Sequence, residues 1–250
     1  MKKSLELFRI ELLLYTRDFS GFFFTFVLPS LMLLLYGSVY GNDPTPYFQG
    51  QGAMDVSVPA YSAMIISVTG LMALPLTFST CKERKIYKRF DATPLGKGRV
   101  ICAQTLVNFC MAILGFFLLL FVGKAVYNIR IPGHWTAIAG ALLLSISAIF
   151  SLGFLFAALA PNIKITNLLC YVSYFVMIFL SGSTVPKELF PEALKTAAQI
   201  LPLTHVVHIL QGTFRGAPLR EYQTSVLLLA LVFLFCTAAG SFLFRRKSWV

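Results

Sequence analysis

The strongest constraint in this sequence is a set of long intervals that contain no Asp, Glu, Lys or Arg. Six of them cover residues 19–42, 56–81, 100–123, 131–163, 165–186 and 222–244. Each is longer than the roughly 20 residues that a helix needs to cross the hydrocarbon core of a bilayer. Because backbone groups find no water there, such apolar segments must fold as helices. We predict an all-α integral membrane protein with six transmembrane helices at about 19–42, 59–81, 100–124, 134–160, 165–186 and 222–244.

The composition leaves little material for a water-exposed domain. Charged residues make up 12% of the 250 residues and hydrophobic residues 57%, whereas soluble domains carry about 25% charged residues. The segments that join the predicted helices are short. We therefore predict a single transmembrane domain over residues 1–250, with no separate catalytic domain.

The basic residues are divided unevenly between the two sides of the predicted bundle. One side holds 15 of the 21 Lys and Arg residues, in 1–18, 82–99, Lys164 and 245–247. The other side holds six, within 43–55, 124–130 and 187–221. Since Lys and Arg accumulate in cytoplasmic loops, we expect both termini and the 82–99 loop in the cytoplasm. Anionic membrane lipid accounts for the net charge of +11, so we expect no nucleic-acid partner.

Residues 1–18 form a predicted amphipathic helix ahead of the first span. Five large apolar side chains fall within one arc of that helix: Leu5, Phe8, Leu12, Tyr15 and Phe19. A helix with one apolar and one charged face lies in the plane of the membrane surface. We expect an interfacial helix on the cytoplasmic leaflet, either as a simple anchor or also as a surface that docks a cytoplasmic partner.

The sequence contains no motif for nucleotide or metal binding. A phosphate-binding P-loop ends in Gly-Lys-Ser or Gly-Lys-Thr, but here Gly96-Lys97-Gly98 is followed by Arg99. His205 and His208 share a helix face without a third ligand, and no pair of the five cysteines has metal-ligand spacing. We predict no catalytic residue, no metal and no cofactor in this chain.

The predicted spans also lack acidic residues. Transporters driven by protons or sodium place a carboxylate, His or basic residue at membrane depth, and none of the six predicted spans contains Asp or Glu. Any energy for transport must then come from a partner. An ATPase that contacts a cytoplasmic loop would suffice.

The 82–99 loop is suited to such a contact. It holds seven basic residues, and Lys82 to Asp91 is predicted to form about three helical turns, with Ile86 and Phe90 on an apolar side. Thr93-Pro94 ends that helix, because a residue before Pro disfavours the α conformation. The loop is either a solvated basic segment or a rigid coupling helix held in a groove of a nucleotide-binding protein.

The 187–221 segment is predicted to form a re-entrant hairpin on the outer side. Ser181-Gly182-Ser183 is expected to loosen the end of the fifth span, and Pro186 and Pro191 prevent regular helix continuation. Two short helices would meet at Pro202, and His205 would serve as a hydrogen-bond partner across the hairpin. The hairpin is either a moving cap over an exit pathway or a static plug.

Two segments, taken in order, resemble the type-2 exporter permeases of ATP-binding cassette (ABC) transporters. The first is 83–95, with its Glu-Arg-Lys start and Thr-Pro-Leu end, and the second runs from Phe179 through Pro186 and Pro191 to Gly212. This resemblance implies a permease subunit that exports an amphipathic or hydrophobic drug, antibiotic or lipid from a bacterium through its cytoplasmic membrane. It also implies a separate ATPase subunit, which binds ATP and Mg, and a second permease copy or a paralogue.

The resemblance assigns roles to two groups of residues. ATPase coupling would involve Glu83, Arg84, Lys88, Arg89, Phe90 and Pro94. The outer gate or hairpin would involve Ser181, Gly182, Pro186, Pro191, Pro202 and His205. The alternative is a polytopic membrane scaffold or sensor-associated protein that has no coupling to an ATPase.

The predicted topology can be tested by cysteine labelling of intact cells. A cysteine at Gln51 should react with a membrane-impermeant reagent, because the 43–55 loop is expected outside. A cysteine at Lys97 should react only after permeabilisation. Labelling of the Lys97 position but not of the Gln51 position in intact cells would overturn the topology.

Overall fold

The computed structural model describes residues 2–45, 50–93, 96–183 and 190–246, and all secondary structure within these ranges is helical. The elements in order are α1 (Lys2–Arg17), α2 (Phe19–Phe22), the π-helical turn η1 (Phe23–Val27), α3 (Leu28–Tyr40), α4 (Ala53–Ser67), the π-helical turn η3 (Val68–Ala73), α5 (Leu74–Glu83), α6 (Ile86–Asp91), α7 (Gly96–Tyr127), α8 (Trp135–Leu159), α9 (Ile163–Leu180), α10 (Glu192–Ile200), α11 (Pro202–Phe214), the 3₁₀ turn η5 (Leu219–Tyr222) and α12 (Gln223–Arg246).

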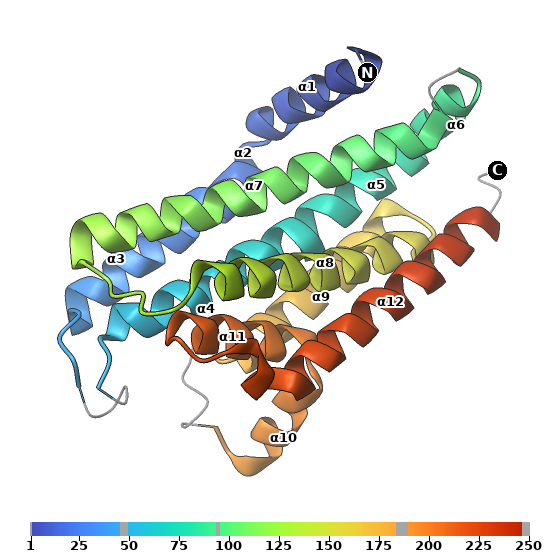
Figure 1. The fold of residues 1–250 in the computed structure, drawn as a ribbon. Helices are drawn as coiled ribbons and strands as arrows, with labels where there is room; N and C mark the ends of the chain where they lie inside the picture. The colour runs from blue at the N-terminus through green and yellow to red at the C-terminus, as the bar shows by residue number, and fades with distance from the viewer. Residues whose placement is uncertain (1, 46–49, 94–95, 184–189, 247–250) are drawn as a thin grey trace.

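Six helical stretches in the described ranges are long and apolar enough to cross a membrane. They are Phe19–Tyr40, Ala53–Glu83, Gly96–Tyr127, Trp135–Leu159, Ile163–Leu180 and Leu219–Phe244. The predicted all-α fold with six spans is confirmed. Figure 1 shows these helices as one bundle, with the start of α1, the end of α12 and the short helix α6 at the same end.

The second span begins at Ala53, earlier than the predicted boundary at 59, and Pro59 lies inside the helix. Asn42 provides the reason, because its Oδ1 accepts hydrogen bonds from the backbone N–H groups of Met54 (3.0 Å) and Asp55 (3.3 Å). The Asp55 carboxylate accepts in turn from the backbone N–H of Gly52. These side chains satisfy helix N–H groups that would otherwise lack partners, so the helix starts before the apolar interval does.

Both π-helical turns precede a proline. Pro29 and Pro75 lie in the first turns of α3 and α5, directly after η1 and η3. Proline has no N–H for the carbonyl one turn earlier, and its ring crowds that carbonyl. The wider π turn before each proline accommodates the proline ring without ending the helix, so each span continues through its proline.

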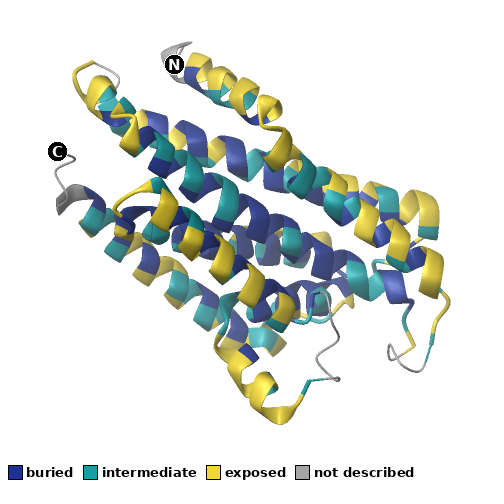
Figure 2. Cartoon of the chain, turned by 180° about the vertical axis from the view of Figure 1, so that it is seen from behind, coloured by how far each residue is buried: buried dark blue, intermediate teal, exposed yellow. Residues whose placement is uncertain are grey.

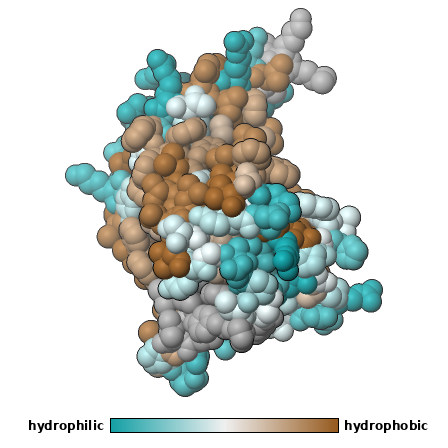
Figure 3. Space-filling model, turned by 90° about the vertical axis from the view of Figure 1, so that its left-hand side faces the viewer, coloured by the Kyte–Doolittle hydropathy of each residue, from teal (hydrophilic) through white to brown (hydrophobic). Residues whose placement is uncertain are grey.

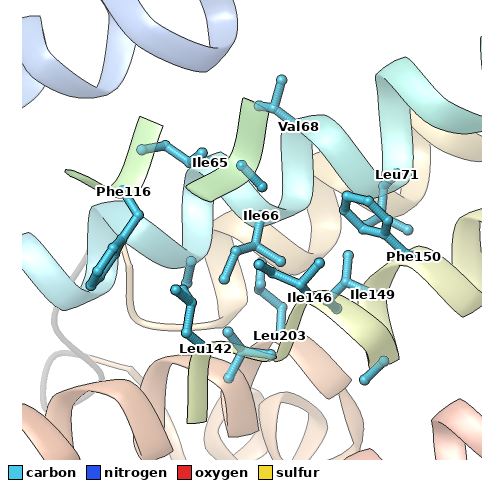
Figure 4. Packing of buried hydrophobic residues seen from close by; sticks show 14 of the residues in the cluster. Ile65, Ile66, Val68, Leu71, Phe116, Leu142, Ile146, Ile149, Phe150 and Leu203 are labelled. Atoms are coloured by element: carbon cyan, nitrogen blue, oxygen red, sulfur yellow. The ribbon is translucent and has the colours of Figure 1, made fainter. Parts of the chain in front are cut away.

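The core lies between the second, third and fourth spans and α11. Figure 4 shows its packing around Ile65, Ile66, Val68, Leu71, Phe116, Leu142, Ile146, Ile149, Phe150 and Leu203. Gly153 of α8 lies so close to the carbonyl of Gly70 in η3 that no side chain could fit between them. In Figure 2 buried residues gather in the central helices, whereas α1 is mostly exposed. The second span is thus enclosed by protein, and α1 remains at the periphery.

Candidate functional site

The connection between α5 and α7 differs from the predicted helix over Lys82–Asp91. The second span extends to Glu83, and Lys85 then adopts the left-handed conformation (φ 57°) before α6 begins at Ile86. A left-handed residue commonly ends a helix and redirects the chain. Glu83 therefore closes α5 and does not open a loop helix, and α6 is a separate short helix.

Tyr87 anchors α6 to the bundle. Its side chain is 2% exposed, its hydroxyl donates a hydrogen bond to Oε1 of Gln104 in α7 (2.9 Å), and its ring lies edge-on to Phe244 of α12. Burial raises the pKa of the Tyr87 hydroxyl above its ordinary value, so the group stays protonated as a donor. This one residue ties the short helix to two spans.

Lys82 and Glu83 join the end of α5 to the α8–α9 connection. The Lys82 ammonium donates to the carbonyl of Ala160 at the end of α8 (2.7 Å). The Glu83 carboxylate accepts from the backbone N–H of Ile163 at the start of α9 (3.2 Å). A cation thus meets a helix C-terminus and an anion meets a helix N-terminus, which suits both helix dipoles. Glu83 has a structural role that the sequence did not predict.

The other predicted coupling residues divide into two groups. Arg84, Lys88 and Arg89 are exposed, whereas Phe90 is partly buried against the core. Pro94 lies outside the described residues. Asp91 ends α6 and binds Lys97 of α7 through an ion pair (2.9 Å) and the backbone N–H (3.1 Å), and these contacts lower the pKa of its carboxyl. The end of the bundle therefore presents cations on a short helix that is fixed at both ends.

A cavity of about 500 Å³ lies beside α6, between α1, α5 and α7. Its walls are largely apolar and include Leu7, Ile10, Leu14, Leu76, Ile86 and Val107. Glu11, Arg84, Gln104 and Asn108 supply polar groups. The cavity lies at the same end of the molecule as the exposed cations of α6.

A small polar network centred on Gln104 forms one wall of this cavity. The Gln104 amide nitrogen donates to Oε1 of Glu11 (3.0 Å) and to Sγ of Cys81 (3.2 Å), while its oxygen accepts from Tyr87. The Asn108 side chain is 4% exposed. Its nitrogen donates to the Gln104 carbonyl (2.9 Å), but its Oδ1 has no hydrogen-bond partner among the described residues. One buried acceptor in the wall of the cavity therefore has no hydrogen-bond partner among the described residues.

Glu11 is a site residue that the sequence did not predict. Within the predicted apolar arc of α1, Tyr15 is buried against the bundle, whereas Leu5 and Phe19 are exposed; Leu7, outside the arc, is also buried. Glu11 lies midway between Leu7 and Tyr15 on the inward side. Burial raises the pKa of its carboxyl, and the hydrogen bond from Gln104 only partly opposes this effect. The available signal was Gln104 and Asn108, four residues apart in an apolar span.

The outer end of α9 is held more tightly than predicted. Ser181 and Ser183 are buried, and both hydroxyls lie within hydrogen-bond distance of the Ile178 carbonyl (3.1 and 3.0 Å). Gly182 between them has φ 84°, which glycine adopts without strain. These residues cap the helix and do not loosen it. Pro186 lies outside the described residues.

The predicted pair of short helices corresponds to α10 and α11. Pro191 precedes α10, Leu201 separates the two helices, and Pro202 occupies the first turn of α11. The missing N–H of Pro202 costs nothing there, since first-turn N–H groups have no partner within the helix. Figure 3 looks onto this end of the molecule, where hydrophilic side chains gather beside a hydrophobic area.

His205 of α11 connects both helices of this hairpin to α12. Its Nε2 lies 2.8 Å from the Gln199 carbonyl of α10, and its Nδ1 lies 2.9 Å from Oγ of Ser225 in α12. A carbonyl only accepts, so Nε2 carries the proton, and in an uncharged ring Nδ1 then accepts from Ser225. His208 Nδ1 also contacts Ser225 (3.2 Å). Both histidines line a cavity of about 590 Å³ with Lys195 and Thr204.

Metal binding has no support in this arrangement. The described residues contain no group of three His, Cys, Asp or Glu side chains that could hold a metal ion. Both ring nitrogens of His205 already have partners. In the outer hairpin, His205 and His208 therefore serve as hydrogen-bonding groups.

Comparison with known proteins places this fold in a family. The family described as "ABC-2 type transporter" matches residues 5–215. Nodulation protein J of Rhizobium leguminosarum bv. viciae is 29% identical over 117 residues, which cover 46% of this chain and 45% of that protein. The similarity to this relative thus spans less than half of either chain.

The raised pKa of Glu11 leads to a prediction about the stability of the folded protein. The folded state binds the Glu11 proton more readily than the unfolded state, so this group's contribution to stability falls as pH rises through the raised pKa. At neutral pH Glu11→Gln should therefore raise the melting temperature of the purified protein. The gain should vanish at acidic pH, where both states carry a neutral Glu11.

Thermal unfolding in detergent at the two pH values provides the measurement. Glu6→Gln makes the same chemical change at an exposed position of α1 and should have no effect. A Glu11→Gln protein that is less stable than the wild type at neutral pH would show that the carboxylate stabilises the fold.

Proposed function

The chain belongs to the ABC-2 type transporter family and is a membrane permease component of an ABC transporter, and we propose that it exports an amphipathic or hydrophobic compound, such as a drug, an antibiotic or a lipid. A separate ATPase subunit would supply the energy and bind ATP and Mg. The permease would work with a second copy or a paralogue in a bacterial cytoplasmic membrane, with both termini in the cytoplasm.

The observation that carries this proposal is the construction of α6. Its exposed Lys88 and Arg89 project from a short helix whose Tyr87 is buried between α7 and α12. Surface charges that make no packing contact contribute little to stability. In a docked interface, however, truncating one partner of a desolvated charge pair costs about 2–5 kcal/mol. A rigid basic helix at one end of the bundle fits an acidic groove on an ATPase.

Contacts around α6 support a route by which a push on this helix would reach the spans. Tyr87 links α6 to α7, and Glu83 and Lys82 link the end of α5 to α8 and α9. A movement of the α5–α6 connection would shift four helices together. A membrane scaffold without ATPase coupling, the competing function, gives no reason for this bracing.

Charge reversal on α6 tests the coupling. Lys88→Glu with Arg89→Glu should leave expression and the melting temperature unchanged, because both side chains are exposed. Copurification of the ATPase should fall at least tenfold, and ATP-driven export should be lost. The matched control is Arg130→Glu with Arg220→Glu, two exposed positions in the α7–α8 connection and the turn before α12.

Three results would contradict the coupling role. Export at the wild-type rate in the α6 variant would show that this helix does not contact the ATPase. A fall of the same size in the control variant would show a general effect of added negative charge. If no ATPase copurifies with the wild-type protein, the proposed ATPase coupling is contradicted as well.

We assign the outer hairpin of α10 and α11 to the exit pathway. His205→Leu removes the contacts to Gln199 and Ser225, which costs about 1 kcal/mol per lost hydrogen bond and should slow export several-fold with the ATPase still bound. His205→Gln retains a donor and should have a mild effect. Full export by His205→Leu would reduce the hairpin to a static plug, and loss of ATPase copurification would indicate a folding role.

A further inference from the structure

We propose that the cavity between α1, α5, α6 and α7 binds an amphiphile that has a primary ammonium head group, with the head at Glu11 and Asn108. This inference rests on the proposed function in one respect, since it names the head-group chemistry of the cargo. The binding itself requires no ATPase. Neither the family description nor the name of the similar protein assigns a ligand to this cavity.

The dimensions and walls of the cavity suit the apolar part of such a ligand. A volume of about 500 Å³ falls within the range of about 300–1,000 Å³ that is typical of small-molecule sites. Leu7, Leu14, Ile86 and Val107 come from α1, α6 and α7 and surround the space with hydrocarbon. An alkyl or aromatic body would pack against these side chains without an unfavourable change of surroundings, because they are as apolar as the lipid that it leaves.

The polar groups of the cavity favour a head group that donates hydrogen bonds. Oδ1 of Asn108 is buried and has no partner among the described residues. The Glu11 carboxylate accepts a bond from Gln104 at one oxygen, and a carboxylate can accept several more. The amide nitrogens of Gln104 and Asn108 already donate to Glu11, Cys81 and the Gln104 carbonyl. A ligand with N–H groups complements this set of acceptors.

The charges select a cation among ligands that donate hydrogen bonds. Glu11 and Asp18 are the acidic residues of the lining, and Arg84 is its basic residue. Arg84 is exposed, so water screens its charge more than that of the partly buried Glu11. A partly buried carboxylate that has only one exposed cation in the same lining is less favourable than a fully solvated one. A bound ammonium would remove that cost, whereas a bound anion would increase it.

Access to the cavity does not require the bundle to open. One wall is α1, which lies at the periphery and packs beside α7 (Figure 1). A single non-helical residue, Asp18, connects α1 to the first span. An amphiphile could therefore reach the cavity from the lipid beside α1, with its body still in the apolar region.

Equilibrium binding in nanodiscs of zwitterionic lipid tests the site. The probe is a fluorophore-tagged long-chain alkylamine, and the reference probe is the same chain with a sulfonate head group. Empty nanodiscs give the background of lipid partitioning. The wild-type protein should bind the amine at least tenfold more tightly than the sulfonate.

The variants locate the head group. Glu11→Gln keeps the size of the side chain and an acceptor for Gln104, and it should weaken amine binding at least tenfold. Asn108→Leu should weaken it as well. Glu6→Gln, on the exposed side of the same helix, should bind as the wild type does. Because Glu11→Gln is nearly isosteric, it keeps the test valid even if Asn108→Leu fails to fold.

Each outcome separates the site from the proposed function. Equal binding of the amine by the wild type and Glu11→Gln, or equal binding of the two probes, would overturn the site, even if export with an ATPase is established. Selective amine binding that Glu11→Gln abolishes supports the site, even if no ATP-driven export is found. In that case the transport function fails and the binding site remains.

Discussion

The amide of Gln104 is the interaction on which the rest of this account depends. It lies in an apolar span where every polar group needs a partner within the protein, and it finds partners on three other helices. Glu11 comes from α1, Cys81 from α5 and Tyr87 from α6. One side chain therefore joins the short basic helix at the end of the bundle to the wall of the neighbouring cavity.

This arrangement connects two sites by a short physical route. The exposed cations of α6, Lys88 and Arg89, follow Tyr87 by one and two residues. The hydroxyl of Tyr87 lies one hydrogen bond from Gln104 and two from Glu11. A partner that displaces α6 would alter the acceptors that face the cavity. Conversely, a ligand that binds Glu11 would change how firmly α6 is held, because coupling between two sites is reciprocal.

The sequence predicted the spans well because each span is determined by its own run of uncharged residues. Intervals without charge must be buried as helices, and the described part of the chain contains six such helices. The break at Lys85 was not predictable in this way, because residues 82–91 contain good helix formers and nothing local requires a turn. The turn serves a distant contact, since it lets Tyr87 reach Gln104. Tertiary packing overrides propensity at this position.

Glu11 shows a second limit of reasoning from the sequence. The absence of Asp and Glu from the predicted spans is correct for those segments, yet a carboxylate reaches the cavity from a helix that precedes them. The sequence also did not reveal the contacts of Lys82 and Glu83 at the C-terminal end of α5, because these residues meet residues 160 and 163 across the bundle. Such partners become visible only once helices far apart in sequence are placed side by side.

The central claim is that α6 and the cavity are coupled through Tyr87, and ATP hydrolysis by the reconstituted complex tests it most directly. The alkylamine probe should stimulate hydrolysis by the wild-type permease with its ATPase. Tyr87→Phe retains the buried ring beside Phe244 and removes only the hydroxyl. We predict that this variant still binds both the ATPase and the probe but loses most of the stimulation. Stimulation of Tyr87→Phe at the wild-type level would contradict the account.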